Sequence, residues 1–408
     1  MPTRLEDVPE HLLVDFDVYD ESIVEEVHER LAEIQQTTGL AYCPAHGGYW
    51  LATTYYDVYE VIRNDDIYSA AQTGLEAKSK LPPVNYDPPE HTAWRQLLNP
   101  LFSPARMTAL EAAIRTKARS LLDTFAGDGL CEFIMAFARP LPTTTFLSLM
   151  GWPLEDEPRL SYWAEALIVG STGDSNEDIG ALRARVGGEV RRYFDAMITE
   201  RRHNPDVDDV TGYLLRARYD DDRNLSHDEL LLLLNQLMGA GLHTVRGIMG
   251  YGMIELAGDT EQRQRLIDDP SLIPTAVEEL LRLGVGTSPG RLVTKPVELH
   301  GVQLQPGDVI LTFLSAANRD PSVFDCPHAL QVDRAHNRHV TFAVGRHRCL
   351  GSNLARIELI VAFEEILRRI PDFRLDEDRP PVFHHSQVRG VRELPLQFSP
   401  SPEPPGRV

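Results

Sequence analysis

Apolar residues recur with a helical period through most of the chain, from about residue 103 to residue 289. The clearest helix begins at Ser226-His227-Asp228-Glu229, where a serine N-cap is followed three residues later by a glutamate, the spacing of a capping box. The segment 230–242 is apolar nearly all round, which is typical of a helix that runs through a protein interior. A second long helix is predicted over 351–369.

Strand patterns are found near the two ends of the chain, where short β-branched or aromatic runs are bounded by Gly and Pro turns. These runs are 49–54, 297–304, 309–313 and 391–398. The predicted fold is therefore mainly α with a small, mostly antiparallel β region. No repeat or linker divides the sequence, so we expect one domain over 1–408, with 400–408 as a disordered tail.

The charge balance narrows the classes of function. With 40 basic and 61 acidic residues, the formal net charge is −21. Nucleic-acid binding needs clustered Lys and Arg, so we expect no nucleic-acid partner. The first ten residues are polar, and the apolar run at 230–242 is shorter than the ~20 residues that cross a bilayer. We expect a soluble, cytoplasmic monomer without a membrane partner.

The four cysteines, Cys43, Cys131, Cys326 and Cys349, stand far apart. No C-x-x-C pair indicates a zinc or iron–sulfur site, and a chain of this length needs no disulfide framework. Cys43, Cys131 and Cys326 are expected to be small buried hydrophobic residues.

Cys349 belongs to the segment 342–351 (FAVGRHRCLG), which has the pattern F-x-x-G-x-x-x-C-x-G. A loop that leads into a helix N-terminus surrounds a thiolate with backbone N–H groups and a favourable dipole. Such a thiolate is a strong electron donor to haem iron. Gly345 and Gly351 would let the backbone turn tightly beside a flat porphyrin, with Phe342 packed near the sulfur. A buried structural cysteine before a helix is the alternative.

Other motifs accompany the cysteine segment. Glu279 and Arg282 form an E-x-x-R pair on one helix face, and Arg334 precedes the cysteine loop. In this order the segments resemble the cytochrome P450 family. The segments 87–91 (DPPEH) with Arg95, and 317–321 (ANRDP), extend the resemblance over nearly the whole chain. The segments 9–12, 15–17, 47–50, 300–304 and 370–373 resemble the camphor-hydroxylating bacterial branch.

This resemblance implies a cytochrome P450 fold around a buried heme b, with Cys349 as the metal ligand. It also implies a set of residues that hold the haem propionates: His91, Arg95, Arg291 and His347. Glu279, Arg282 and Arg334 would form a buried ion network that fixes the cysteine loop, a structural role whose loss costs roughly 3–5 kcal/mol.

The segment 240–244 (AGLHT) resembles the family's oxygen-activating A/G-G-x-D/E-T segment. The resemblance implies that Ala240 and Gly241 leave room for O2 and that Thr244 hydrogen-bonds the oxygen or a neighbouring water. His243 stands where the family carries an acid, and we expect its imidazole to relay protons. Two alternatives remain: a local hydrogen bond to a neighbouring helix, or ligation of the iron by His243.

The resemblance places substrate above the haem, lined by the loop 72–86, Leu237, Gly241, Thr287 in 285–289, and Val388 in 387–388. Because these residues are mostly small or apolar, we expect a small hydrophobic substrate, with a terpenoid as the first candidate.

Electrons must come from outside the chain, which carries no flavin or iron–sulfur segment. We expect them to come from NAD(P)H through a reductase and an acidic ferredoxin, steered by a basic patch of Arg338, Arg346 and Arg348. The sequence thus predicts an O2-dependent monooxygenase. A non-oxygenating haem-binding relative, a peroxide-driven enzyme and a helical scaffold without haem are the alternatives.

Overall fold

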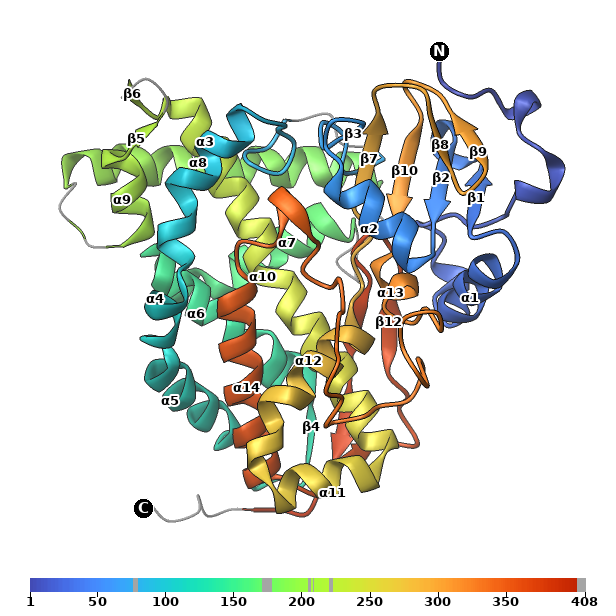
Figure 1. Cartoon of the computed structure of the whole chain (residues 1–408). Helices are drawn as coiled ribbons and strands as arrows, with labels where there is room; N and C mark the ends of the chain where they lie inside the picture. Colours follow the sequence, from blue (N-terminus) through green and yellow to red (C-terminus); the bar gives the residue numbers. More distant parts are fainter. Residues whose placement is uncertain (76–79, 171–177, 205–206, 208, 220–222, 402–408) are drawn as a thin grey trace.

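The computed structural model describes residues 1–75, 80–170, 178–204, 207, 209–219 and 223–401. Helices make up most of the molecule, and a smaller β-rich part lies to one side, on the right in Figure 1. The predicted mainly α fold with a small β region is confirmed.

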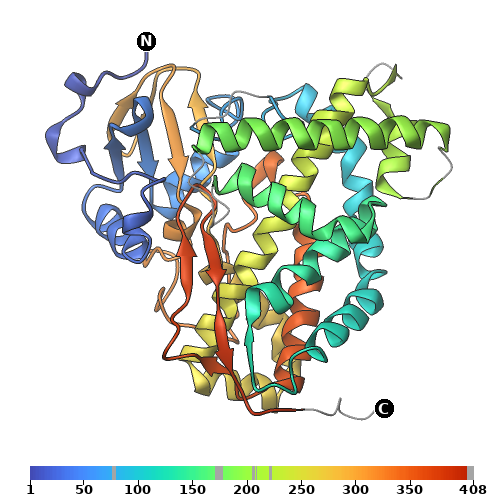
Figure 2. The ribbon, with the colours of Figure 1, turned by 180° about the vertical axis from the view of Figure 1, so that it is seen from behind.

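Helix α10 (His227–Gly258) runs through the middle of the helical part, as Figures 1 and 2 show from opposite sides. The Ser226 side chain accepts from the Glu229 backbone N–H and the Glu229 side chain accepts from the Ser226 N–H, so the predicted capping box is formed. Its 32 residues extend about 48 Å. Helices α6 (Pro140–Met150), α7 (Glu157–Ile168), α8 (Ile179–His203) and α12 (Ile273–Gly284) pack around it.

The other α-helices are α1 (Val27–Thr37), α2 (Tyr55–Arg63), α3 (Glu90–Leu98), α4 (Pro104–Thr108), α5 (Glu111–Leu122), α9 (Val210–Arg216), α11 (Thr260–Asp268), α13 (Leu314–Ala317) and α14 (Ser352–Arg369). The second predicted long helix is thus confirmed as α14, which packs against α5 and α12. Helices α1 to α3 precede residue 103, so the helical part begins earlier than the sequence indicated.

The largest sheet has the order β1-β2-β10-β7-β3, with β1 (Leu40–Cys43), β2 (Tyr49–Ala52), β10 (Val309–Thr312), β7 (Gly290–Val293) and β3 (Tyr68–Ser69). All of its pairings are antiparallel except β10 with β2. The smaller sheets consist of β11 (Arg374–Leu375), β14 (Pro395–Gln397) and β4 (Leu130–Glu132); β12 (Val382–His384) and β13 (Gly390–Glu393); β8 (Val297–Leu299) and β9 (Val302–Leu304); and β5 (Arg218–Tyr219) and β6 (Arg223–Asn224).

Several strand boundaries differ from the prediction. The run 297–304 is a hairpin, because His300 (φ 50°) and Gly301 (φ 77°) reverse the chain between β8 and β9. The run 391–398 is divided between β13 and β14, and β4, β5 and β6 lie inside the stretch predicted as helical. These strands are two to four residues long, too short for a period to be detected.

Cys43 and Cys131 are buried as expected, but Cys326 is exposed, which corrects the prediction. Cys326 sits at a positive φ of 47°, and its carbonyl accepts the Ala329 N–H at 3.0 Å and Arg334 Nη2–H at 3.5 Å. The backbone of this turn, rather than the thiol, therefore contacts the rest of the protein. Within the described ranges, none of the helices is both long and apolar enough to cross a membrane. Of the predicted tail, 402–408 lies outside the described residues.

Candidate functional site

The cysteine loop, residues 342–351, folds back on itself before α14. The Cys349 N–H donates to the Phe342 carbonyl at 2.8 Å. Gly345 has a φ of 70°, and a Cβ there would lie 3.3 Å from the Arg63 Cα, so both conformation and space favour glycine. Gly351 differs from its prediction: its φ is −81° and a Cβ would meet nothing within 4 Å, so no tight turn requires glycine there.

The Cys349 thiol lies in an electropositive environment. Part of the Cys349 surface is exposed to solvent. The protein atoms packed around the thiol nevertheless desolvate it, which raises its pKa. A hydrogen bond from the Gly351 N–H and the charges of Arg95, Arg348 and Arg356 act in the opposite direction. Arg95 is held there by Nη1, which donates to the Arg348 carbonyl at 2.8 Å. A cation bound to the sulfur would displace the thiol proton, which favours Cys349 as a metal ligand.

Three nitrogen atoms next to this loop are buried and have no hydrogen-bond partner among the described residues: His91 Nε2, His347 Nε2 and Arg291 Nε. The rings of His91 and His347 lie 4.0 Å apart. Burial, reinforced by neighbouring arginines, lowers the pKa of His91 to about 4 and of His347 to about 2. Burial also lowers the pKa of Arg291 to about 10, although the charges of Asp87 and Asp65 oppose this shift. These nitrogen atoms come from α3, β7 and the cysteine loop, and none has an acceptor among the described residues.

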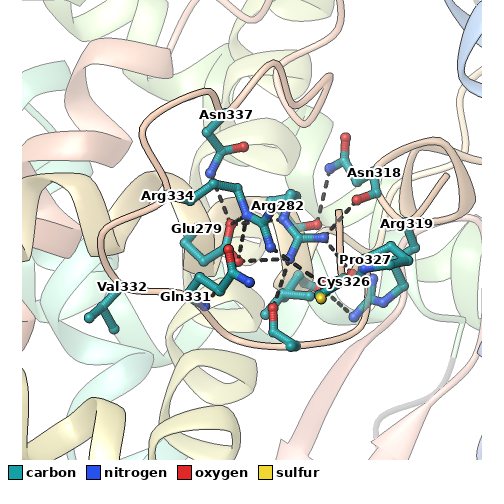
Figure 3. A network of polar contacts seen from close by, with 12 residues as sticks. Glu279, Arg282, Asn318, Arg319, Cys326, Pro327, Gln331, Val332, Arg334 and Asn337 are labelled. Carbon is teal, nitrogen blue, oxygen red and sulfur yellow. Dashed lines mark hydrogen bonds and ion pairs between the residues drawn. The ribbon is translucent and has the colours of Figure 1, made fainter. Parts of the chain in front are cut away.

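Glu279 of α12 is the centre of a buried ion network (Figure 3). Arg282 Nη2 lies 2.7 Å from Glu279 Oε1, and both side chains are 0% exposed. Arg334 Nε lies 3.0 Å from Glu279 Oε2. The structure therefore brings together the acid and the two arginines that the sequence singled out.

The network also binds the loops on either side. Arg282 Nη1 donates to the carbonyls of Asn318 and Pro327 at 2.8 and 2.6 Å. Asn318 Nδ2 donates to Thr341 Oγ1 at 2.8 Å, and Asn318 Oδ1 accepts the Val340 N–H at 2.8 Å. Asn318 thus connects the network to the start of the cysteine loop. Its segment was noticed in the sequence, but its own role was missed.

On α10, Thr244 Oγ1 donates to the Ala240 carbonyl at 3.2 Å. Ala240 is exposed, and the helical spacing places it on the same face as Leu237 and Thr244. Gly241 has a different neighbour from the one expected, because a Cβ there would lie 2.6 Å from the Phe146 ring of α6. Close packing of α10 against α6 is therefore one reason for glycine at position 241.

His243 points into a buried polar cluster between α10, α7 and β12. Its ring lies edge-on to the His384 ring at 5.1 Å, and its Nε2 is 3.5 Å from Arg246 Nη2. Arg246 Nη1 lies 3.0 Å from Glu165 Oε2. Burial, followed by the charges of Arg246 and His384, holds the His243 pKa well below its usual value, so the imidazole is neutral. His384 and Glu165 come from distant segments and gave no signal in the sequence.

Thr287 and Val388 face each other across an isolated β-bridge. Beside it, the Gln387 amide uses both its donors and its acceptor: Nε2 donates to the carbonyls of Thr73 and Ser288, and Oε1 accepts from Tyr19 Oη and the Leu75 N–H. The amide ties the loop 72–75 to the turn that carries Val388. Residues 76–79 of the predicted lining loop lie outside the described residues.

Burial lowers the pKa of His384 to about 4, and the charge of Arg246 adds to this shift. An unfolded chain protonates its histidines near pH ~6.5, so the unfolded state binds a proton first as the pH falls. We expect this group to reduce the free energy of unfolding by up to about 1.4 kcal/mol per pH unit between about pH 6.5 and 4. Urea unfolding should show that the free energy of unfolding of His384→Gln falls less steeply than that of the wild type between about pH 6.5 and 4. His11→Gln changes an exposed position, so its slope should match that of the wild type. Equal slopes for all three proteins would contradict the assignment.

Comparison with known proteins identifies the class. The family model described as Cytochrome P450 matches residues 177–398, more than half of the chain. Cytochrome P450 CYP107DY1 of Priestia megaterium is 33% identical over 375 residues, which cover 86% of this chain and 90% of that protein. The chain belongs to the cytochrome P450 family and is a cytochrome P450 monooxygenase.

Two further proteins show the range of the similarity. The Steroid C26-monooxygenase of Mycobacterium tuberculosis is 31% identical over 358 residues, covering 86% of this chain and 95% of that protein. The crystal structure of cytochrome P450 CYP101C1 aligns with a TM-score of 0.87 at 28% identity, covering 97% of this chain and 100% of that one.

Family membership implies heme b on a cysteine thiolate, with O2 as co-substrate and electrons from NAD(P)H through redox partners. The residues present fit this group. Cys349 offers a thiol beside cationic groups, and His91, His347 and Arg291 offer buried donors that need an anion. The two haem propionates are such anions, and accepting these hydrogen bonds would offset the cost of burying the donors.

Proposed function

We propose that this cytochrome P450 hydroxylates a small hydrophobic compound of the terpenoid class, with Cys349 as the axial ligand of the haem iron. The setting of the Cys349 thiol, beside the Gly351 N–H and three arginines, carries the proposal. The half-buried Thr287 and Val388 and the apolar Leu237 favour a hydrophobic substrate. The name of the mycobacterial relative, which acts on a steroid, supports the same general class.

The residues of the chain hold the cofactor and its surroundings, while bound haem supplies the activation of dioxygen. His91, Arg95, Arg291 and His347 are assigned to the propionates. Glu279, Arg282 and Arg334 hold the cysteine loop in place through the contacts to Asn318.

Thr244 is assigned to hydrogen bonding on the oxygen-binding side, because Oγ1 lies on the helix face shared with Ala240 and Leu237. His243 is assigned to proton supply. Its imidazole is neutral, and because Arg246 Nη2 donates to Nε2, the ring proton is on Nδ1. Nδ1 has no partner among the described residues, so this proton is available to be donated. Glu165, whose side chain is 20% exposed, connects the cluster to the surface through Arg246.

A ferredoxin and its reductase are the proposed electron donors. Arg338, Arg346 and Arg348 are all exposed near the cysteine loop, on a chain of net charge −21. Arg346 lies 3.0 Å from Asp65, which reduces its share of the patch. The remaining positive charge favours an acidic partner at this surface.

A single domain over 1–408, acting as a monomer, is part of the proposal. Distant segments share sheets: β2 pairs with β10, and β4 pairs with β14. Such pairing between distant segments supports one domain, because few contacts cross a domain boundary.

Turnover of a terpenoid panel tests the function. We expect a hydroxylated product when ferredoxin, reductase, NAD(P)H and O2 are supplied, with the inserted oxygen derived from labelled O2. Product from peroxide alone would favour the peroxide-driven alternative, and haem binding without any oxidised product would favour the non-oxygenating one.

In the same assay, His243→Asn should lower the fraction of NAD(P)H that appears as product, because the variant lacks the imidazole assigned to proton supply.

A further inference from the structure

A second ion network lies next to the Glu279 network and includes Arg356, one of the three arginines near the Cys349 thiol. Glu278 accepts from Arg356 of α14 in two contacts, Nε to Oε1 at 2.6 Å and Nη2 to Oε2 at 2.9 Å. His339 Nε2 lies 3.0 Å from Glu278 Oε2. The side chains of Glu278, Arg356 and His339 are 29, 26 and 4% exposed, so this network is largely shielded from solvent.

The network reaches the cysteine loop through Phe342. The Arg356 guanidinium carbon lies 4.5 Å from the centre of the Phe342 ring, a cation–π contact. The Thr341 N–H donates to His339 Nδ1 at 3.3 Å, so the ring proton is on Nε2 and is donated to Glu278. Because the Phe342 carbonyl accepts the Cys349 N–H, a continuous series of contacts joins Glu278 to the ligand-bearing residue.

Arg356 also acts on Cys349 through its charge. It lies seven positions after Cys349, at the fifth residue of α14. Burial raises the pKa of the Cys349 thiol, and the charge of Arg356 is among those that oppose it. Burial also raises the pKa of Glu278, but the hydrogen bonds from His339 and Arg356 outweigh it and hold that pKa at about 2. Glu278 is therefore ionised, and its negative charge opposes the positive charge that Arg356 places near the sulfur.

We propose that Glu278 and Arg356 are positioning residues that set the reduction potential of the haem iron, because together they fix the net positive charge next to the Cys349 sulfur. The inference rests on the proposed function, since it requires Cys349 to be the axial ligand. Positive charge near the sulfur stabilises negative charge on it and weakens its donation to the metal. Reduction adds a negative charge to the site, which nearby positive charge also favours.

Potentiometric titration of the holoenzyme tests this sign rule. Glu278→Gln leaves Arg356 without a counter-charge, so the potential should become more positive. Arg356→Gln removes the cation, so the potential should become more negative, and the double variant should return toward the wild-type value. Arg356→Lys keeps the charge and loses the paired contact and the ring stacking, so its potential should stay near the wild type. A purely structural role predicts shifts in the same direction for both glutamine variants, and that result would overturn the inference.

Asp123→Asn is the control for charge removal. Asp123 Oδ1 lies 3.4 Å from Nη2 of Arg369, which belongs to α14 as Arg356 does. Arg369 is thirteen residues beyond Arg356, roughly 20 Å further along the axis, so this variant should leave the potential unchanged. A comparable shift in Asp123→Asn would overturn the inference. If the wild-type protein shows the thiolate band of the reduced carbon monoxide complex but the variants have unchanged reduction potentials, this inference alone is overturned. A wild-type protein without that band overturns the proposed function as well.

Discussion

Replacing Cys349 with alanine is expected to abolish the long-wavelength absorbance band of the reduced, carbon monoxide-bound protein, and product formation with it. That band would require a thiolate to hold the haem iron, and alanine offers no ligand atom. The propionate donors His91, Arg291 and His347 are untouched by this change, so the variant should still take up haem. The reduced, carbon monoxide-bound variant should absorb at a shorter wavelength, and its turnover should fall to the detection limit.

Cys326→Ser is the control for this experiment, because Cys326 is the other cysteine that is exposed among the described residues. This variant should keep both the band and the activity. If Cys349→Ala kept the long-wavelength band, another residue would have to be the ligand, and the assignment of Cys349 would be wrong.

The long helices and the large features of the fold could be predicted from the sequence. Helix α10 carries both a capping box and a continuous apolar run, which are local signals that act over many residues. The hairpin of β8 and β9 could not be predicted, because it depends on positive φ angles at His300 and Gly301 and on strands of three residues. A pattern so short fits a single longer strand equally well.

The site shows the same division between local and distant signals. The cysteine loop and the pair Glu279 and Arg282 have fixed spacings that the sequence displays directly. The partners of His243 do not, because Glu165 and His384 approach it from α7 and β12. Gly241 shows a further limit, because its motif gave no sign of Phe146, the residue about a hundred positions away whose ring leaves no space for a Cβ there.

Replacing Glu279 with glutamine is expected to lower the free energy of unfolding by roughly 3–5 kcal/mol. Glutamine has nearly the same shape, but it leaves Arg282 and Arg334, whose side chains are 0 and 7% exposed, without a counter-charge. Buried guanidinium groups cannot recover hydration, so the unpaired charge itself is the main cost. Because Arg282 also holds the Asn318 carbonyl, the cysteine loop should loosen and the variant should lose haem more readily. Urea unfolding and the amount of haem retained after gel filtration measure the two effects.

Glu365→Gln provides the matched comparison. Glu365 is equally buried, at 2% exposure, and is also surrounded by arginines, but Arg115, Arg119 and Arg368 are 26, 53 and 39% exposed. These three groups are able to turn to water when the carboxylate charge is removed, so the loss should be about 1 kcal/mol. Glu365 also lies far along α14 from the cysteine loop, so haem should be retained. Equal losses in the two variants would mean that burial of the carboxylate, rather than burial of its arginine partners, determines the stability of such networks in this protein.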